Sequence, residues 1–271
     1  MELSKRLQAV ADLLDCHEKI ADIGCDHGFV SIYLIESKKA SWCLAMDVNK
    51  GPLERAREHV LEKRLSTYIE TRLSDGAKEV RFVKDECGKE KLEVEAALIA
   101  GMGGRLMIQI IKDSLQKFQS MEEFVLQPQS EIAKVRQFIR EIGYHIAKED
   151  MILEDGKYYP MMKVVRGAVE TDFVTNVPKR LREKNILGDE KLIEDESNTR
   201  IQIVFDEYGE HLLKEKHQVL LQFLCKEKEN YQEIYAKLLQ MDTEKSESRR
   251  KEIDEKLKLI NLGLEWFEYE M

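Results

Sequence analysis

Two aspartates and two glycines follow a short apolar run in the segment Ala21-Asp22-Ile23-Gly24-Cys25-Asp26-His27-Gly28. An apolar run that enters a glycine turn and then a helical pattern is typical of a strand–turn–helix unit that holds a nucleotide at the carboxyl edge of a parallel sheet. A dinucleotide pyrophosphate needs glycine where the backbone approaches it, and the carboxylate of Asp26 would repel that group. The segment therefore indicates a nucleoside ligand that brings positive charge.

Acidic residues also end the next two apolar runs. Asp47 stands 19 residues after Gly28, where a carboxylate can accept hydrogen bonds from both ribose hydroxyls. Asp75, in Ser74-Asp75-Gly76, can hold an adenine amino group. S-adenosylmethionine has a ribose, an adenine, a sulfonium and an ammonium but no phosphate, so the set favours a methyl donor over NAD. Each aspartate could instead cap a helix or begin a turn, but their recurrence at consecutive strand ends favours binding.

A fourth apolar run ends in Ala100-Gly101-Met102-Gly103-Gly104-Arg105. Enzymes that methylate an exocyclic amine commonly carry Asn or Asp, two prolines and an aromatic residue here, because the delocalised lone pair of that nitrogen needs hydrogen-bond acceptors. A ring nitrogen such as adenine N1 already has an in-plane lone pair, so backbone carbonyls and close approach can suffice. The glycines suit tight positioning against a cofactor and a base, although a plain strand-to-helix turn would also use them.

Composition limits the class of protein. The 271 residues include 43 Lys and Arg against 52 Asp and Glu, a net charge of −9, which excludes a uniformly basic nucleic-acid-binding surface but not a local basic patch. The five cysteines form no Cys-x-x-Cys pair, so we expect neither a disulfide framework nor a bound metal. Apolar runs are too short to cross a bilayer and the first residues do not read as a signal peptide, so we expect a cytoplasmic protein without membrane contact.

The elements that must position these residues alternate between short apolar runs and amphipathic stretches, the pattern of a parallel sheet with helices on both faces. Pro52 suits the first turn of a helix, and Ser130 can cap a helix that stops at Gly143. Two further runs are separated by the turn Glu154-Asp155-Gly156-Lys157 and predict an antiparallel hairpin at the sheet edge. The predicted strands are 20–24, 42–46, 67–72, 94–100, 123–127, 144–153 and 158–166.

The last third of the chain has a different period. Apolar positions from Leu213 to Met241 and from Ile253 to Phe267 follow a three-four heptad spacing, with the polar segment 242–248 between them. This pattern predicts an antiparallel coiled-coil hairpin. The predicted fold is therefore α/β, with a C-terminal α-helical coiled-coil hairpin. We expect a methyl-donor-binding domain over 1–166, a connecting region over 167–207 and a helical coiled-coil domain over 208–271.

Over nearly the whole chain, the sequence resembles the bacterial tRNA methyltransferases that modify N1 of adenine 22. The resemblance implies the fold of a class I Rossmann-like methyltransferase with a C-terminal α-helical coiled-coil hairpin. The Ala-Gly-Met-Gly-Gly element is the most specific match, and Cys25, Gly28 and Asp47 depart modestly from a familiar member. The resemblance depends on these segments: Leu3-Ser4-Lys5-Arg6-Leu7, Ala21 to His27, Gly51-Pro52, Asp75-Gly76, Ile99 to Gly104, Leu126-Gln127-Pro128, Glu154-Asp155-Gly156-Lys157-x-Tyr159 and Leu212 to Lys216.

The resemblance implies S-adenosyl-L-methionine as cofactor, tRNA as substrate and Asp26 as the acidic residue closest to the reacting centre. The expected cofactor-binding residues are Asp22, Gly24, Cys25, Asp26, His27, Gly28, Asp47, Val48, Asp75, Gly76, Ala100, Gly101, Met102 and Gly103. The residues expected to contact RNA are Lys5, Arg6, Arg105, Gln127, Tyr159, Lys214 and Lys216. Tyr159 is a candidate stacking surface for the base, and we expect a monomer rather than an oligomer.

Three other classes compete with this interpretation. A non-catalytic protein could keep the methyltransferase fold and bind RNA or a partner, although the intact acidic strand ends argue against it. A small-molecule methyltransferase would fit the net negative charge of the chain, but the C-terminal helical hairpin would then have no explained function. A nicotinamide oxidoreductase is opposed by Asp26.

Overall fold

The computed structural model describes residues 3–167, 194–240 and 243–267. The chain divides into two compact units, Met1–Val169 and Glu170–Met271, and each is considered by itself. Most of the expected connecting region, residues 168–193, lies outside the described residues.

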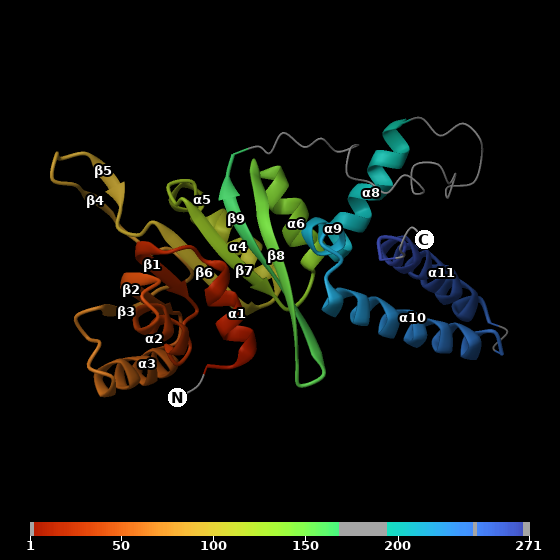
Figure 1. The fold of residues 1–271 in the computed structure, drawn as a ribbon, viewed down its shortest axis with the longest axis horizontal. Helices are drawn as coiled ribbons and strands as arrows, with labels where there is room; N and C mark the ends of the chain where they lie inside the picture. The colour runs from red at the N-terminus through yellow and green to blue at the C-terminus, as the bar shows by residue number, and fades with distance from the viewer. Residues whose placement is uncertain (1–2, 168–193, 241–242, 268–271) are drawn as a thin grey trace. The chain divides into compact units, whose positions relative to one another are not determined.

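The first unit is built on a seven-stranded sheet with the order β3-β2-β1-β6-β7-β9-β8 (Figure 1). Five strands are parallel and β9 pairs antiparallel with both β7 and β8, so the predicted edge hairpin is confirmed. The order changes direction between β1 and β6, and ligands bind at the carboxyl ends of strands beside such a switch point. The bounds are β1 His17–Ile23, β2 Ala40–Asp47, β3 Ile69–Leu73, β6 Ala96–Met102, β7 Glu123–Pro128, β8 Tyr144–Glu154 and β9 Lys157–Arg166.

Helices cover both faces of this sheet because successive strand residues point to opposite sides. On β1, Ala21 and Ile23 pack in one apolar core while Ile20 packs in the other. The first core includes residues of α4 Gly104–Asp113, α5 Leu115–Phe118 and α6 Ile132–Glu141. The second includes residues of α1 Lys5–Leu13, α2 Phe29–Glu36 and α3 Lys50–Glu62. The inner parallel strands β1, β2, β6 and β7 are largely buried on both faces, which explains their mostly apolar sequences, whereas the edge strand β3 is partly exposed.

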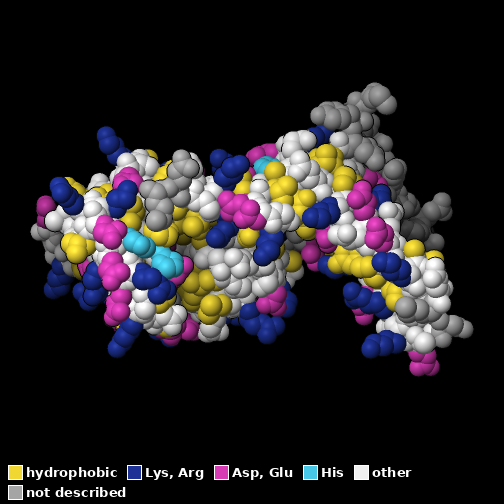
Figure 2. All heavy atoms as spheres, turned by 90° about the horizontal axis from the view of Figure 1, so that it is seen from below, with side chains coloured by type: hydrophobic (Ala, Val, Ile, Leu, Met, Phe, Trp, Pro, Cys, Tyr) yellow, Lys and Arg dark blue, Asp and Glu magenta, His cyan; other side chains and the backbone are white. Residues whose placement is uncertain are grey.

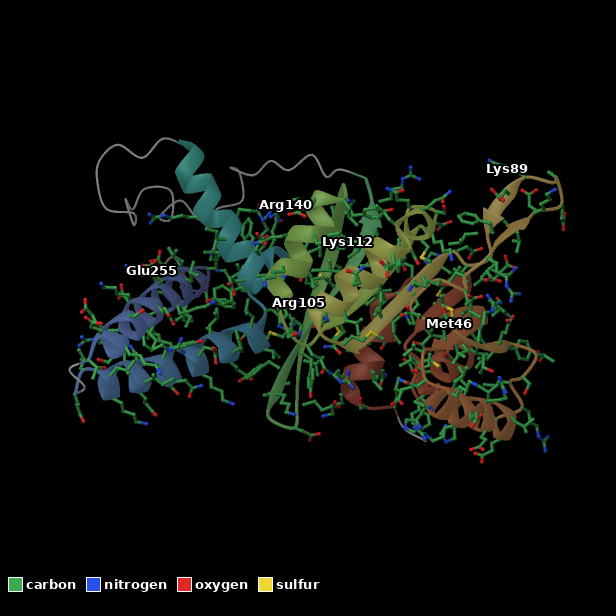
Figure 3. All side chains as sticks on the ribbon, turned by 180° about the vertical axis from the view of Figure 1, so that it is seen from behind. Met46, Lys89, Arg105, Lys112, Arg140 and Glu255 are labelled. Atoms are coloured by element: carbon green, nitrogen blue, oxygen red, sulfur yellow. The ribbon has the colours of Figure 1, made fainter. Side chains whose placement is uncertain are left out.

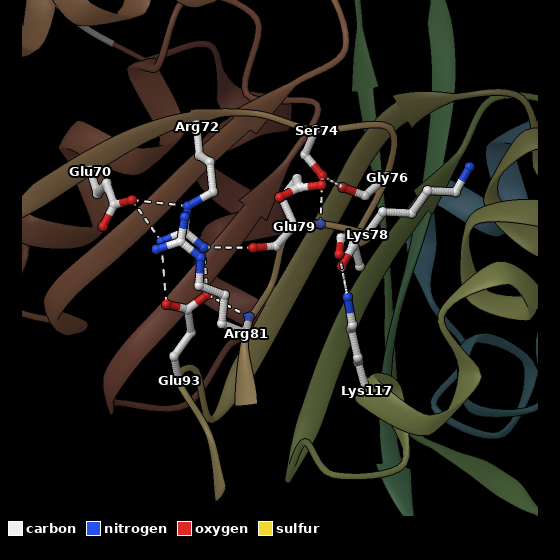
Figure 4. Close-up of polar contacts among 10 residues, drawn as sticks. Glu70, Arg72, Ser74, Gly76, Lys78, Glu79, Arg81, Glu93 and Lys117 are labelled. Atoms are coloured by element: carbon white, nitrogen blue, oxygen red, sulfur yellow. Dashed lines mark hydrogen bonds and ion pairs between the residues drawn. The ribbon is translucent and has the colours of Figure 1, made fainter. Parts of the chain in front are cut away.

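A small hairpin between β3 and β6 was not expected. Its strands β4 Phe82–Lys84 and β5 Glu90–Leu92 are short and mostly exposed, so they carry no apolar run that a sequence pattern detects. Buried Arg72 on β3 holds the base of this hairpin, because its guanidinium donates to the carboxylates of Glu70 and Glu93, at 2.6 and 2.5 Å (Figure 4). It also donates to the carbonyl of Glu79 at 2.6 Å.

The predicted helix cap at Ser130 is wrong. The residue before α6 is Glu131, which has φ +51° and makes no side-chain cap. The carbonyl of Ser130 instead accepts a hydrogen bond from the N–H of Gly104 at 3.0 Å, so this residue ties α6 to the start of α4. The helix ends before Gly143, which has φ +77°, as the sequence predicted.

The second unit contains the predicted helical hairpin, formed by α10 Gln218–Leu238 and α11 Glu244–Leu264 (Figure 1). The expected polar link 242–248 is too long, because Thr243 and Ser246 form a capping box and α11 begins at Glu244. Leu213 does not join α10, since it lies in the separate short helix α9 Glu210–Lys214.

Helix α8 Glu194–Tyr208 precedes α9, where no element was expected. Its C-terminal end packs on the hairpin: Phe205 and Trp266 have ring centroids 5.4 Å apart. A Cβ built on Gly263 of α11 would stand 3.1 Å from the ring of Tyr208. The hairpin is therefore part of a helical unit that includes α8 and α9.

Candidate active site

A cavity of about 480 Å³ lies at the carboxyl ends of β1, β2, β3 and β6. Twelve of the fourteen expected cofactor-binding residues line it, the exceptions being Gly28 and Gly103. The strand order brings these residues together, because carboxyl ends of neighbouring parallel strands meet at one edge of the sheet.

The glycine turn after β1 is fixed by the backbone of β2. The N–H groups of Gly24 and Cys25 both donate to the carbonyl of Met46, each at 2.8 Å. Gly24 has φ +81°, and a Cβ there would collide with the side chain of Met102. Gly28 has φ +75° and a Cβ there would stand 3.0 Å from that of Ala56 on α3, so this glycine lets α2 approach α3 rather than lining the cavity.

Asp22 is the deepest acid in the cavity wall. Its side chain is buried, and Oδ2 accepts a hydrogen bond from the Ser31 hydroxyl at 2.6 Å. Burial raises the pKa of Asp22 to about 6, because a carboxylate loses hydration in the protein interior. A cationic ligand would favour its ionised form. Ser31 was missed by sequence reasoning, since its position one helical turn into α2 gives no signal of its contact with Asp22.

Asp47 and Asp26 face each other across the turn. The Oδ1 atom of Asp47 accepts from the N–H of Asn49 at 2.7 Å, and Oδ2 accepts from the N–H of Asp26 at 3.3 Å. These bonds orient a nearly buried carboxylate at the end of β2. The side chain of Asp26 is 68% exposed on a residue with φ +47°, and its Oδ1 lies 3.6 Å from Nε2 of His27. Asp26 is therefore displayed toward solvent while its backbone supports Asp47.

The adenine end of the expected site is more open. The side chain of Asp75 is 64% exposed and forms an ion pair with Lys78, so a hydrogen bond to an adenine amino group would compete with this lysine. Val48 beside Asp47 is 58% exposed, and Leu106 is 52% exposed. Both also line the cavity, and exposed apolar side chains of this kind suit a flat purine ring.

The turn after β6 needs its glycines for close packing. Gly101 has φ +77°, and its N–H donates to Oε1 of Gln127 at 3.1 Å. A Cβ on Gly104 would collide with the carbonyl of Ser130 and stand 2.8 Å from the side chain of Val135. A Cβ on Gly103 would lie 3.1 Å from the Ser130 hydroxyl, so Gly103 belongs to this packing contact and not to the cavity wall.

The residues expected to contact RNA are placed differently from one another. Arg6 lines the cavity, and its guanidinium lies 5.1 Å above the ring centroid of Tyr159, so one face of that candidate stacking ring is covered. Buried Gln127 contacts Arg6 without lining the cavity, and Lys5 is exposed on α1. Arg105 is 84% exposed at the first turn of α4 (Figure 3), where it pairs with Glu131 at 3.2 Å.

Lys214 and Lys216 belong to the second unit. The Nζ atom of Lys214 pairs with Glu210 at 2.6 Å, and Lys216 is half-buried after α9. Basic and acidic side chains are intermingled on the face shown in Figure 2, so no uniformly basic surface is seen there.

Several cavity residues were not expected from the sequence. Arg6 was expected at RNA but lines the cavity, and Asn49, Leu106, Ile110 and Gln129 are among the other residues of its wall. Of these four, Asn49 is the one that lies next to an acidic strand end, where a sequence signal could have been read.

The described residues also lack metal-binding clusters and membrane-spanning helices. The described residues contain no group of three or more His, Cys, Asp or Glu arranged to hold a metal ion. None of the helices within those residues is long and apolar enough to cross a membrane. All five cysteines are free thiols, and burial raises the pKa of Cys25 and Cys43 far above the ordinary range.

The fold and the site together define a class of protein. A sheet with this order, a glycine turn after the first strand and carboxylates at three neighbouring strand ends are the features of a Rossmann-like methyltransferase. The chain belongs to the Methyltransferase domain family, which matches residues 3–162.

Particular relatives share nearly the whole chain. A tRNA (adenine(22)-N(1))-methyltransferase of Bacillus subtilis is 28% identical over 261 residues, which cover 96% of each chain. The crystal structure of a B. subtilis m1A22 tRNA methyltransferase has a TM-score of 0.72 and 26% identity, covering 98% of this chain and 99% of that one. A Streptococcus pneumoniae protein in complex with S-adenosyl-L-methionine has a TM-score of 0.71 and 25% identity, covering 98% of this chain and 100% of that one. The resemblance drawn from the sequence is confirmed.

Proposed function

We propose that the protein is an S-adenosylmethionine-dependent tRNA methyltransferase that modifies N1 of adenine 22. The observation that carries this proposal is the convergence of Asp22, Asp26 and Asp47 on one cavity at the switch point of the sheet. Three carboxylates around a nucleoside-sized cavity fit a ligand with a ribose and two cationic groups, and they oppose a phosphate-rich one. The relatives named above supply the substrate, tRNA, and the position of the methylated base.

Each acidic residue has a distinct proposed task. Asp47 is already oriented by two backbone N–H groups, and its remaining lone pairs accept from the ribose hydroxyls. Asp22 and its Ser31 partner give the amino-acid part of the cofactor a buried negative charge. Asp75 and Gly76 lie at the adenine ring of the cofactor, and Val48 and Leu106 make apolar contacts with that ring. The other proposed cofactor contacts are Gly24, Cys25, His27, Ala100, Gly101 and Met102, whereas Gly28 and Gly103 shape the turns without lining the cavity.

The reaction demands positioning more than proton transfer. When bound, S-adenosylmethionine supplies an electrophilic methyl group on a sulfonium. Adenine N1 carries no proton in the neutral base, so no residue has to remove one before attack. N1 lies on the Watson–Crick edge, and the nucleotide must leave its pair to reach the cavity. As methylation proceeds, positive charge appears on the purine, and the exposed carboxylate of Asp26 accepts a hydrogen bond from the adenine amino group and stabilises that charge.

The test is a methylation assay with labelled methyl donor and unmodified tRNA, followed by digestion and location of the label. We expect the label at N1 of adenine 22, and no label on a matched tRNA that carries guanine at that position. Cofactor and tRNA binding without any methyl transfer would instead support the alternative, a non-catalytic RNA-binding protein that keeps the fold.

We further propose that the enzyme is a cytoplasmic monomer. The proposed division of labour assigns cofactor binding to residues 1–166 and part of the RNA contact to the helical region 208–271, joined by 167–207. Light scattering of the purified protein tests the monomer: a mass near the 31.7 kDa of one chain is expected.

A further inference from the structure

Gln127, at the end of β7, is a fully buried polar residue whose side-chain amide is held at both ends. Its Oε1 atom accepts two hydrogen bonds, from Nη1 of Arg6 at 2.8 Å and from the N–H of Gly101 at 3.1 Å. Its Nε2 atom donates to the carbonyl of Pro128 at 3.2 Å. One amide therefore links an arginine of α1 to the turn after β6.

Arg6 is held from three strands. Besides Gln127 on β7, the ring of Tyr159 on β9 lies under its guanidinium at 5.1 Å, a distance typical of a cation–π contact. Glu154 at the end of β8 accepts from the backbone N–H of Arg6 at 3.4 Å. These contacts fix both the backbone and the planar group of an arginine that is half-buried at the cavity wall.

The charge of Arg6 stands out in its surroundings. Of the described residues that line the cavity, four are aspartates and Arg6 is the sole lysine or arginine. Within residues 3–167 its guanidinium makes one hydrogen bond, to Gln127, although a guanidinium carries five N–H donors. The acceptor, the side-chain amide of Gln127, is neutral. It therefore orients the guanidinium of Arg6 without compensating its positive charge.

We propose that Arg6 binds the phosphate beside the target adenosine and that Gln127 is a positioning residue that aims Arg6 and the Gly101 turn at the same nucleotide. This assignment rests on the proposed function. The acidic cavity attracts the cationic cofactor but repels RNA phosphate, so a phosphate of the substrate needs a cation such as Arg6. A fixed guanidinium with free donors is suited to two parallel hydrogen bonds to phosphate oxygens. Gln127 then sets the distance between the phosphate site and the turn where the base must lie.

The first arm of the test uses tRNA binding and its salt dependence. Arg6→Ala should weaken tRNA binding roughly 10-fold and reduce the slope of log affinity against log salt by about 1, the value for one lost phosphate contact. Arg6→Lys keeps the charge but not the planar fork, so it should retain the slope and lose part of the affinity. Cofactor affinity should stay within twofold of wild type. An unchanged slope in Arg6→Ala would overturn the phosphate assignment.

The second arm tests Gln127 with an isosteric change. Gln127→Glu places a carboxylate against Arg6 and should lower tRNA affinity as much as Arg6→Ala does, although Arg6 is still present. Combining the two substitutions should cause no further loss, because both remove the same interaction. The matched control is Arg57→Ala, whose side chain contacts Thr71 at 3.1 Å outside the cavity. Wild-type tRNA binding by a folded Gln127→Glu protein would overturn the positioning role.

The third arm does not depend on tRNA methylation. With S-adenosylhomocysteine at saturation, AMP should bind more tightly than adenosine to the wild-type protein, and Arg6→Ala should remove this preference. Equal binding of AMP and adenosine to wild type overturns the proposal even if tRNA is methylated. A preference for AMP in a protein that methylates no tRNA would retain the phosphate site and reject the proposed function alone. Thermal unfolding of each variant verifies that it is folded.

Discussion

The two ends of the parallel strands treat negative charge in opposite ways. At the carboxyl ends, Asp22 and Asp47 accept hydrogen bonds from neutral donors, a serine hydroxyl and two backbone N–H groups. At the amino end, buried Glu123 meets Nε2 of His17 at 3.0 Å and Nζ of Lys163 at 2.6 Å. The two buried carboxylates at the first end, Asp22 and Asp47, are oriented by neutral donors, whereas Glu123 at the second end is paired with cations.

The difference separates binding from stability. A buried carboxylate without a cation costs free energy in the folded protein until a positive ligand arrives, so its presence is explained by function. A buried carboxylate between two cations belongs to an ion-pair network, and its removal destabilises the fold because the partly buried cations lose compensation. Substitutions at the two ends should therefore have opposite signatures in stability and in cofactor affinity.

The largest effect is expected for Asp26→Ala. If this exposed carboxylate stabilises charge that develops on the purine, turnover should fall roughly 100-fold while cofactor affinity changes little. Single-turnover methylation and cofactor titration on the same variant separate the two quantities. A loss confined to cofactor affinity would make Asp26 a binding residue only.

Asp22→Asn should stabilise the folded protein but weaken cofactor binding. Burial raises the pKa of Asp22 to about 6, above its value in the unfolded chain. Its contribution to the free energy of unfolding is therefore most favourable at acidic pH and is lost as the pH rises through 6. At pH 7 the neutral amide should raise the free energy of unfolding by about 2 kcal/mol without cofactor. Cofactor affinity should drop at least 10-fold. Denaturant titrations at pH 5 and pH 8 test this, and equal changes at both values would contradict it.

Glu123→Gln should destabilise the folded protein and leave cofactor binding unchanged. The amide leaves His17 and Lys163 without their shared carboxylate, which should lower the free energy of unfolding by about 2 kcal/mol. Cofactor affinity should remain that of wild type, because the residue lies at the opposite end of the strands. Urea unfolding and calorimetric cofactor titration make the comparison. Weaker cofactor binding in this variant would remove the distinction between the two ends.

The smallest effect is a pH dependence carried by His17. A hydrogen bond with Glu123 raises the pKa of His17 above 6.5, so its stabilising contribution is present below pH 6.5 and is lost as the pH rises through the folded value. We expect a loss below about 1 kcal/mol across this window, absent in His17→Gln. Burial alone would raise the pKa of Glu123, but its hydrogen bonds from His17 and Lys163 lower it, so its own contribution is lost only at more acidic pH. A wild-type curve parallel to that of His17→Gln would contradict the assignment.

The centre of the sheet was predictable because β1, β2, β6 and β7 contain apolar runs that stand out between turns. The edge hairpin was predictable from the turn between its strands, although β8 contains several charged residues. The β4–β5 hairpin was not, since exposed strands of three residues carry no periodic signal. Helix α8 was missed for a related reason: its apolar residues Val204, Phe205 and Tyr208 gather at one end and do not repeat along its length. The cap predicted at Ser130 failed because the residue that precedes α6 is Glu131, in a left-handed conformation that a local motif does not reveal.

The sequence by itself determined the chemistry of the cavity: which strand ends carry carboxylates, where glycine is required and which ligand charge they tolerate. Those properties depend on residue type and on position relative to a strand end, and both can be read along the chain. Only the tertiary structure decided which partners those groups have. Ser31 beneath Asp22, the amide of Gln127 between Arg6 and Gly101, and Tyr159 beneath Arg6 are contacts between separate elements. They arise when strands β1, β6, β7 and β9 align, because side chains far apart in sequence become neighbours only through the register of the sheet.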